Sequence, residues 1–168
     1  MSDNNATIKL NNQTVECPIL KGTLGPDVVQ IAGLAKTKNF TFDPGFVATA
    51  ACESKITFID GEQGILLHRG YPIDQLAFDS DFMEVCYLLM YGELPNKQQK
   101  AQFIEQIKFR NNVHEQISNF FNGFRRDAHP MAIMVGVVGA LSAFYDSTEN
   151  LSQEDYRNLS SIRLVAKM

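Results

Sequence analysis

The feature that most constrains the fold is an apolar stretch, residues 130–145, in which no side chain is charged. A membrane-spanning helix needs about 20 consecutive apolar residues, so this stretch is too short to cross a bilayer. The stretch predicts a helix that begins at Pro130, ends near Asp146 and is buried on all sides in a protein core.

Small residues gather on one side of this predicted helix. Ala132, Gly136, Gly139, Ala140 and Ala143 recur at i, i+3 and i+4 spacing. Each glycine inside a helix costs about 1 kcal/mol relative to alanine. That cost is explained if another backbone approaches this side closely. Two interpretations stay open, a tight helix contact within one chain or an interface between subunits.

Alternating apolar residues in the first part of the chain predict two β-hairpins. The first covers residues 7–19 with residues 11–12 as its turn. The second covers residues 55–68, where Gly61 and Gly64 can adopt the positive φ that such a turn needs. A short helix is expected between the hairpins, beginning after Pro26 and ending at Gly33.

From Pro72 onward the apolar residues recur with a helical period, and proline or polar capping residues mark most helix starts. The fold class is therefore mainly α, a helix bundle with small amino-terminal β-hairpins. Two regions are expected, a hairpin and connector region over 1–50 and a helical region over 51–168. The predicted helices in the second region are residues 72–76, 79–91, 96–109, 114–124, 130–145 and 152–163.

The composition fits one globular domain and argues against several functions. Of the 168 residues, 45% are apolar and 20% are charged, and the net charge of −4 gives no attraction to nucleic acid or to an anionic membrane. Cys17, Cys52 and Cys86 form no CxxC or Cys/His pattern, so we expect neither a disulfide framework nor a metal site. Reduced thiols and the lack of an apolar leader indicate a cytoplasmic protein.

One segment resembles the fingerprint of a known family. Residues 53–77 read ESKITFIDGEQGILLHRGYPIDQLA. The segment is similar to the amino-terminal fingerprint of citrate synthases, IDG-x-x-G-x-L-x-x-RGY-x-I-x-x-LA. The first hairpin and the variant at residues 68–70 resemble the hexameric enzymes of Gram-negative bacteria. The similarity covers essentially the whole chain, through residues 20–25, 42–46, 84–89, 91–95, 114–116 and 125–131.

The resemblance implies an amino-terminal fragment of the large domain of an enzyme that condenses acetyl-CoA with oxaloacetate to citrate in the tricarboxylic acid cycle. In the family an aspartate removes a methyl proton, one histidine stabilises the enol and a second assists attack on the ketone. The second histidine lies in a G-x-G-H motif. The histidines here follow Leu67, Val113 and Ala128. We therefore assign no catalytic residue to this chain and expect the chain alone to be inactive.

The resemblance also implies an allosteric site for NADH. The tyrosine, arginine and lysine of that site in the Gram-negative type match Tyr145, Arg163 and Lys167. A loop of the same site aligns with residues 109–112. This loop has phenylalanine and asparagine where arginine and methionine are expected, and Arg110 is the candidate substitute.

The residues themselves give a separate indication of an anion site. Arg163 and Lys167 lie four residues apart on one face of a predicted helix. Two like charges at this spacing cost about 0.2–0.5 kcal/mol unless an anion lies opposite them. The alternative is a pair of cations near the carboxyl end of a helix, where the helix dipole favours positive charge.

The resemblance further implies a homo-oligomer, a dimer through helices 114–124 and 130–145 and a hexamer of such dimers. No cofactor, nucleic acid or membrane is expected. Acetyl-CoA and oxaloacetate are the expected substrates and NADH the allosteric inhibitor. Two alternatives stay open, a 2-methylcitrate synthase that takes propionyl-CoA, and a non-catalytic dimerisation or nucleotide-binding module derived from the family.

Overall fold

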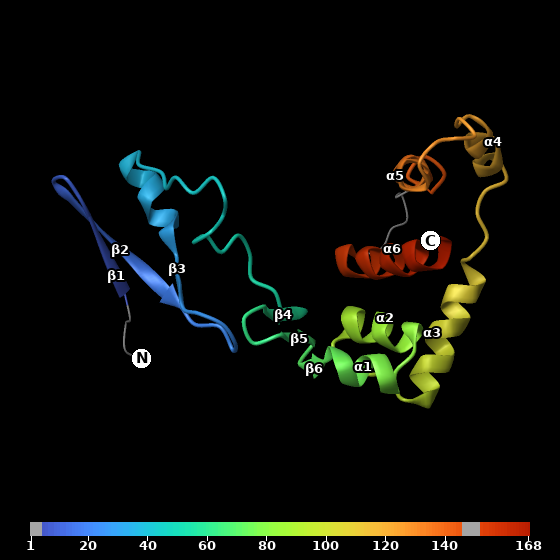
Figure 1. The fold of residues 1–168 in the computed structure, drawn as a ribbon, viewed down its shortest axis with the longest axis horizontal. Helices are drawn as coiled ribbons and strands as arrows, with labels where there is room; N and C mark the ends of the chain where they lie inside the picture. Colours follow the sequence, from blue (N-terminus) through green and yellow to red (C-terminus); the bar gives the residue numbers. More distant parts are fainter. Residues whose placement is uncertain (1–4, 146–151) are drawn as a thin grey trace. The chain divides into compact units, whose positions relative to one another are not determined.

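The computed structural model describes residues 5–145 and 152–168 (Figure 1). It divides into two compact units, Met1–Glu93 and Leu94–Met168. Small antiparallel sheets, a 3₁₀ helix and two α-helices make up the described part of the first unit, and four α-helices make up that of the second. The chain is therefore mainly α with small amino-terminal hairpins, as the sequence predicted.

The first unit begins with a three-stranded antiparallel sheet. Strand β1, Asn5–Leu10, pairs with β2, Gln13–Leu20, and Leu10 lies opposite Gln13. Asn11, whose φ is 48°, and Asn12 form the turn between the two strands. Asparagine tolerates positive φ better than most residues. The first predicted hairpin is confirmed.

The helix predicted between Pro26 and Gly33 is wrong. Val28–Val29 is a short strand, β3, that pairs with the end of β2. The helix that follows is a 3₁₀ helix, η1, Ile31–Thr37, and Gly33 lies inside it. Backbone pairing with the preceding strand β2 overrode the local helical signal here.

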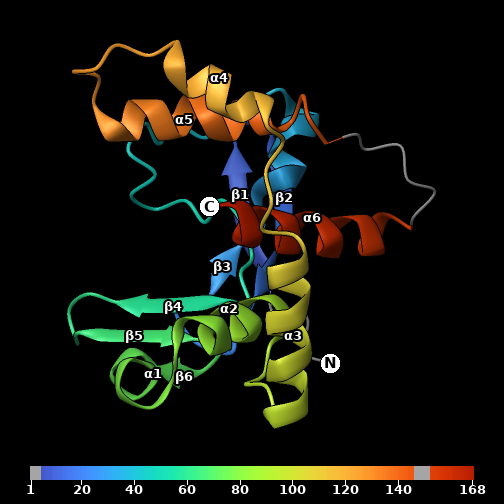
Figure 2. The same cartoon turned by 90° about the vertical axis from the view of Figure 1, so that its right-hand side faces the viewer.

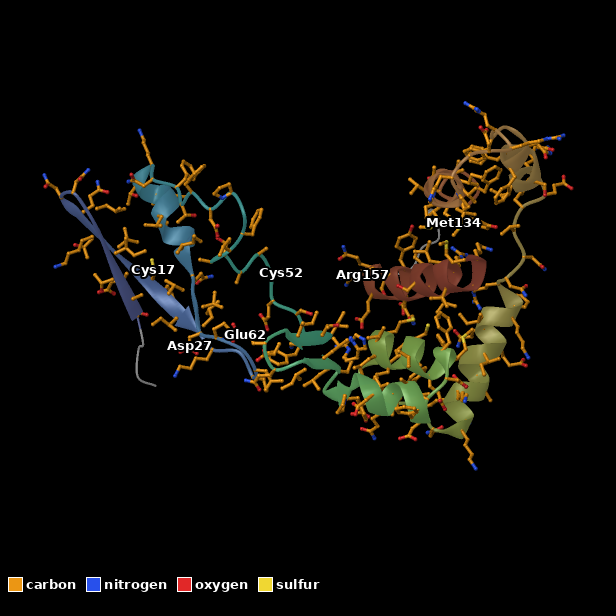
Figure 3. All side chains as sticks on the ribbon, viewed as in Figure 1. Cys17, Asp27, Cys52, Glu62, Met134 and Arg157 are labelled. Atoms are coloured by element: carbon orange, nitrogen blue, oxygen red, sulfur yellow. The ribbon has the colours of Figure 1, made fainter. Side chains whose placement is uncertain are left out.

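Gly33 allows η1 to lie close to β2. A Cβ at Gly33 would come within 3.3 Å of Val15 Cγ1, a tight contact. Cys17 lies two residues further along the same face of β2 and is fully buried (Figure 3). The hairpin and η1 thus share a small core, and Cys17 fills it as an apolar side chain.

The second sheet of this unit contains β4, Thr57–Asp60, β5, Ile65–His68, and β6, Tyr71–Pro72. In the β4–β5 turn, Asp60 Oδ1 accepts hydrogen bonds from the backbone N–H groups of Glu62 and Gln63 at 3.1 and 3.0 Å. Gly64 adopts a φ of 67°, whereas Gly61 is not among the described residues with positive φ. The second hairpin is confirmed, and its turn requires only Gly64 to be glycine.

Two helices complete the first unit, α1, Ile73–Asp79, and α2, Phe82–Tyr91. The predicted boundary between them was wrong, because α1 continues to Asp79 and α2 begins later. Asp81 determines that start, since its carboxylate accepts from the Glu84 N–H at 2.9 Å and the Glu84 carboxylate accepts from the Asp81 N–H at 2.9 Å. This capping box satisfies N–H groups that the first turn leaves unpaired.

Arg69 joins the second sheet to α2. Its Nη2 and Nε donate to the Leu89 carbonyl oxygen at 2.7 and 3.3 Å, and its backbone N–H donates to the Ile56 oxygen at 2.7 Å. The Leu89 carbonyl belongs to the last turn of α2, where the helix leaves carbonyl oxygens unpaired. Arg69 reaches it with a φ of 52°, in the left-handed region.

Four helices lie in the described part of the second unit, and hydrogen bonds near their first residues mark where they begin. Asn96 caps α3 in a capping box with Gln99, and Ser152 Oγ accepts from the Asp155 N–H to cap the last helix. Figures 1 and 2 show α4 and α5 side by side. The helices are α3, Lys97–Phe109, α4, Gln116–Asn122, α5, Pro130–Leu141, and α6, Gln153–Lys167.

The apolar helix α5 ends earlier than predicted. The Ser142 hydroxyl donates to the Gly139 carbonyl oxygen at 2.7 Å. The backbone N–H groups of residues 142–144 bond to the third residue before them instead of the fourth. These bonds tighten the last turn and end the α-helix at Leu141. Asp146, the predicted end, lies outside the described residues.

Burial on all sides, predicted for this helix, is wrong for the chain as it stands. Val137 and Leu141 are buried against Ile117 of α4, while Met131 and Val135 are 62% and 73% exposed. Because α4 covers only one side of α5, the helix presents a second apolar side to solvent. None of the described helices combines the length and hydropathy needed to cross a membrane.

The small residues of α5 have two different environments. A Cβ at Gly136 would lie 2.9 Å from Phe124 Cζ, so an aromatic ring of the same chain occupies the space that glycine leaves. A Cβ at Gly139 would meet no atom within 4 Å. At Gly136 the close approach comes from a side chain within the chain, not from another backbone. At Gly139 the subunit interpretation stays a prediction.

Candidate functional site

A cavity of about 350 Å³ lies in the second unit, between the end of α5 and one face of α6. This volume is at the small end of the roughly 300–1,000 Å³ usual for ligand pockets. The α5 side contributes Val138, Leu141, Ser142 and Tyr145. The α6 side contributes Tyr156, Ser160, Arg163, Leu164 and Lys167.

Helical spacing places the α6 residues on one face. Each of residues 156, 160, 163, 164 and 167 lies three or four positions from another member of the set, so together they cover one side of the helix. Arg163 and Lys167 belong to the carboxyl half of α6, where the helix dipole favours cations. The predicted shared face of these two cations is confirmed, and both line the cavity.

The ammonium group of Lys167 is held by neutral groups. Lys167 Nζ donates to the carbonyl oxygens of Arg110 at 2.9 Å and Asn112 at 2.7 Å. It also lies 4.3 Å from the centroid of the Tyr145 ring, within range of a cation–π interaction. The Tyr145 hydroxyl is 3.5 Å from the same Asn112 oxygen. The end of α6 is thereby connected to the segment that follows α3 (Figure 2).

Arg110 does not bring its charge to the cavity. Its Nη1 donates to the Gln106 carbonyl oxygen at 3.2 Å, and its guanidinium carbon lies 5.7 Å from the centroid of the Phe109 ring. The guanidinium thus stays on α3, and Arg110 contributes its carbonyl oxygen to Lys167. Of the four residues predicted for an NADH site, the structure brings Tyr145, Arg163 and Lys167 together.

The two positions where this loop departs from the family pattern make different contacts. Asn112 contacts Lys167 through its backbone oxygen, an atom that every residue type supplies. The Phe109 side chain is 82% exposed and is not among the residues that line the cavity. Neither of these two side chains is among the described residues that line the cavity.

Tyr156, Ser160 and Ser142 were not predicted as site residues. Tyr156 and Ser160 could have been found by extending the Arg163/Lys167 spacing backward along the same helix, seven residues from Arg163 and from Lys167 respectively. Ser142 follows the end of α5, and no pattern in the sequence connects it with α6. The Ser142 hydroxyl uses its proton in the hydrogen bond to Gly139, so its oxygen can act only as an acceptor toward another group.

The lining favours an anionic ligand with a flat or apolar part. Its described residues contribute two cations and four hydroxyl groups, and no carboxylate is among them. Guanidinium and ammonium groups form charge-assisted hydrogen bonds with phosphate oxygens. Val138, Leu141 and Leu164 add apolar surface beside these donors. A phosphate-bearing ligand with an aromatic ring fits this combination.

The three histidines serve local structure. His68 Nδ1 lies 3.2 Å from the Thr57 hydroxyl across the β4–β5 pair. His114 Nδ1 accepts from the Gln116 N–H at 3.2 Å, at the start of α4, and His129 Nδ1 accepts from the Met131 N–H at 3.2 Å, at the start of α5. Within residues 5–145 and 152–168, no three His, Cys, Asp or Glu side chains lie close enough together to hold a metal ion.

Comparison with known proteins gives a consistent result. Residues 45–168 match the family described as citrate synthase, C-terminal domain. The structure resembles citrate synthase from Pyrobaculum aerophilum, with a TM-score of 0.60 and 26% identity over 96% of this chain and 37% of that one.

A second solved structure has a similar fold. It is citrate synthase from the thermophilic archaeon Thermoplasma acidophilum, in a ternary complex with carboxymethyl coenzyme A and oxaloacetate. Its TM-score is 0.68 and its identity 21%, over 76% of this chain and 33% of that one. This chain spans about a third of the length of both structures.

Proposed function

Because the chain belongs to the citrate synthase family, we propose that the protein it forms part of condenses acetyl-CoA with oxaloacetate, releasing citrate and CoA after addition of water. The family match over residues 45–168 carries this proposal. The solved structure that binds carboxymethyl coenzyme A and oxaloacetate supports it through a shared fold. We expect a cytoplasmic enzyme whose acid–base groups lie outside this chain.

Activity of the whole protein tests this proposal. CoA release should require both oxaloacetate and an acyl-CoA, and kcat/KM for acetyl-CoA should exceed that for propionyl-CoA. One additional methylene changes such a ratio by roughly 10–200-fold. A preference for propionyl-CoA would identify a 2-methylcitrate synthase instead. Release of CoA from neither substrate would favour a non-catalytic module.

We also propose that the cavity beside α6 binds NADH and that its occupancy lowers the enzyme's affinity for acetyl-CoA. Two cations, several hydroxyl groups and an apolar wall at one cavity support this proposal. The ammonium of Lys167 and the guanidinium of Arg163 would contact the phosphates, and the apolar wall would hold a ring of the nucleotide. Arg110 is an indirect participant, because it holds Lys167 through its carbonyl oxygen.

Titration of the whole protein with NADH tests this second proposal. Coupling between two sites is typically about 1–3 kcal/mol, so NADH should weaken acetyl-CoA binding by roughly 5–150-fold. Arg163→Ala and Lys167→Ala should each weaken NADH binding about tenfold or more, since hydrogen bonds to charged groups contribute roughly 1.5–3 kcal/mol.

Arg157→Ala is the matched control for these variants. Arg157 lies on the same helix, is exposed and does not line the cavity (Figure 3). This variant removes the same charge, and NADH should inhibit it as strongly as it inhibits the wild type. Equal inhibition in all three variants would mean that Arg163 and Lys167 are only part of a solvated helix face.

We propose that the second apolar side of α5 is covered by another subunit, with α4 beside it in the interface. Met131, Val135 and Gly139 lie on this exposed side, and Phe121 of α4 is 46% exposed. Obligate subunit interfaces are apolar and bury about 2,000–5,000 Å². A dimer through these helices, and a hexamer of such dimers, is the assembly that the resemblance implies.

A further inference from the structure

We propose that Lys167 is a latch between the cavity and the loop that leads into α4, and that an anion in the cavity opens it. The latch consists of the Lys167 ammonium group and the carbonyl oxygens of Arg110 and Asn112. This inference rests on the proposed nucleotide site and adds how occupancy of that site reaches the rest of the fold.

The geometry places one ammonium group in two roles. Lys167 lines the cavity, yet two of its three N–H donors are directed to the loop carbonyls at 2.9 and 2.7 Å. These acceptors are neutral. A phosphate oxygen carries negative charge, so it adds to the hydrogen bond a charge–charge attraction that a neutral carbonyl oxygen does not supply. An anion beside Arg163 therefore competes with the loop for Lys167.

The loop is held by few contacts besides this one. Residues 111–115 are exposed and belong to no helix or strand. Besides the bonds that it makes to the start of α4, the loop has the Tyr145 hydroxyl at 3.5 Å from the Asn112 oxygen and the His114 ring at 5.3 Å from the Phe144 ring. Segments with few buried contacts open at low free-energy cost. Losing Lys167 would thus release this loop at low free-energy cost.

Release of the loop would reach α4 directly. The first turn of α4 takes its bonds from the loop, because the N–H groups of Gln116 and Ile117 donate to His114 and that of Ser118 donates to Glu115. Ile117 in turn packs on Val137 and Leu141 of α5. A change at Lys167 is thereby passed through the loop and α4 to the helix pair proposed for the subunit interface.

Hydrogen–deuterium exchange of the whole protein tests the latch. The variant Lys167→Met keeps the length of the side chain and removes its charge and donors. Without ligand, residues 110–118 should exchange about tenfold faster in Lys167→Met than in wild type, because two hydrogen bonds to a charged group are lost. Lys167→Arg keeps charge and donors and should stay close to wild type. Residues 153–160 of α6 serve as the internal control and should not change.

The ligand arm separates the latch from the nucleotide site. NADH should raise exchange of residues 110–118 in wild type toward the Lys167→Met level and leave Lys167→Met unchanged. Equal exchange in ligand-free Lys167→Met and wild type overturns the latch, as does NADH binding without faster exchange. If NADH does not bind, the nucleotide proposal fails by itself. In that case, inorganic pyrophosphate is added in place of NADH. Faster exchange of residues 110–118 supports the latch, and unchanged exchange overturns it.

Discussion

The 168-residue chain, purified alone and mixed with acetyl-CoA and oxaloacetate, should release CoA no faster than protein-free buffer. All three of its histidines already serve local structure, two at helix starts and one across a strand pair. The resemblance places the acid–base groups outside the chain. Enzymes accelerate reactions by about 10⁶-fold or more, so loss of these groups should remove the whole effect.

The whole protein assayed in parallel is the positive control for this experiment. Variants of the chain in which each histidine is replaced by alanine are the internal control. Turnover by the chain alone that disappears with His68→Ala, His114→Ala or His129→Ala would contradict the prediction and place a catalytic group here.

In the whole protein, Gly139→Leu should separate the subunits while each chain stays folded. A Cβ at Gly139 meets nothing within 4 Å of its own chain, so the leucine has room there. Leucine also favours a helix interior over glycine by about 0.8 kcal/mol. If α5 packs against another subunit on this side, the new side chain fills space that the partner requires. Light scattering measures the mass of the particle, and thermal unfolding measures the stability of the chain.

Gly136→Leu is the matched comparison on the same helix. A Cβ there would lie 2.9 Å from Phe124 Cζ, so a leucine overpacks the contact between α4 and α5 within the chain. Overpacking costs about 1–3 kcal/mol, so this variant should unfold at lower temperature whatever the subunit arrangement. If Gly139→Leu kept the native particle mass, this side of α5 would not be the interface.

The sequence predicted the helices best where the signal is local. Asn96, Ser152, His129 and Gly92 mark helix ends that depend on hydrogen bonds or φ values within a few residues. It failed where the cause lies in another element of the fold. Val28–Val29 became a strand because β2 was available to pair with it, and Met131 and Val135 are exposed because α4 covers only one side of α5.

In the candidate site, too, the sequence predicted what depends on local spacing and missed what depends on another part of the chain. Spacing along one helix placed Arg163 and Lys167 on one face, and the same rule extended backward reaches Ser160 and Tyr156. The partners of Lys167 could not be predicted, because they are backbone oxygens 55 and 57 residues away in the chain. Every residue has such an oxygen, so side-chain patterns carry no information about which of them a lysine will reach.

Arg69 gives the family fingerprint a meaning apart from chemistry. Within the RGY part of that pattern, the Arg69 side chain connects the β4–β5 hairpin with the carboxyl end of α2. Gly70 beside it has a φ of 90°. Arg69 and Gly70 are therefore needed for the hairpin and α2 to pack together within the chain. A family member that had lost its catalytic groups would still need both residues for this segment to fold. A survey that recognises family members by this stretch alone therefore selects for correct assembly of the hairpin and α2, and identifying active enzymes needs a second motif that carries the acid–base groups.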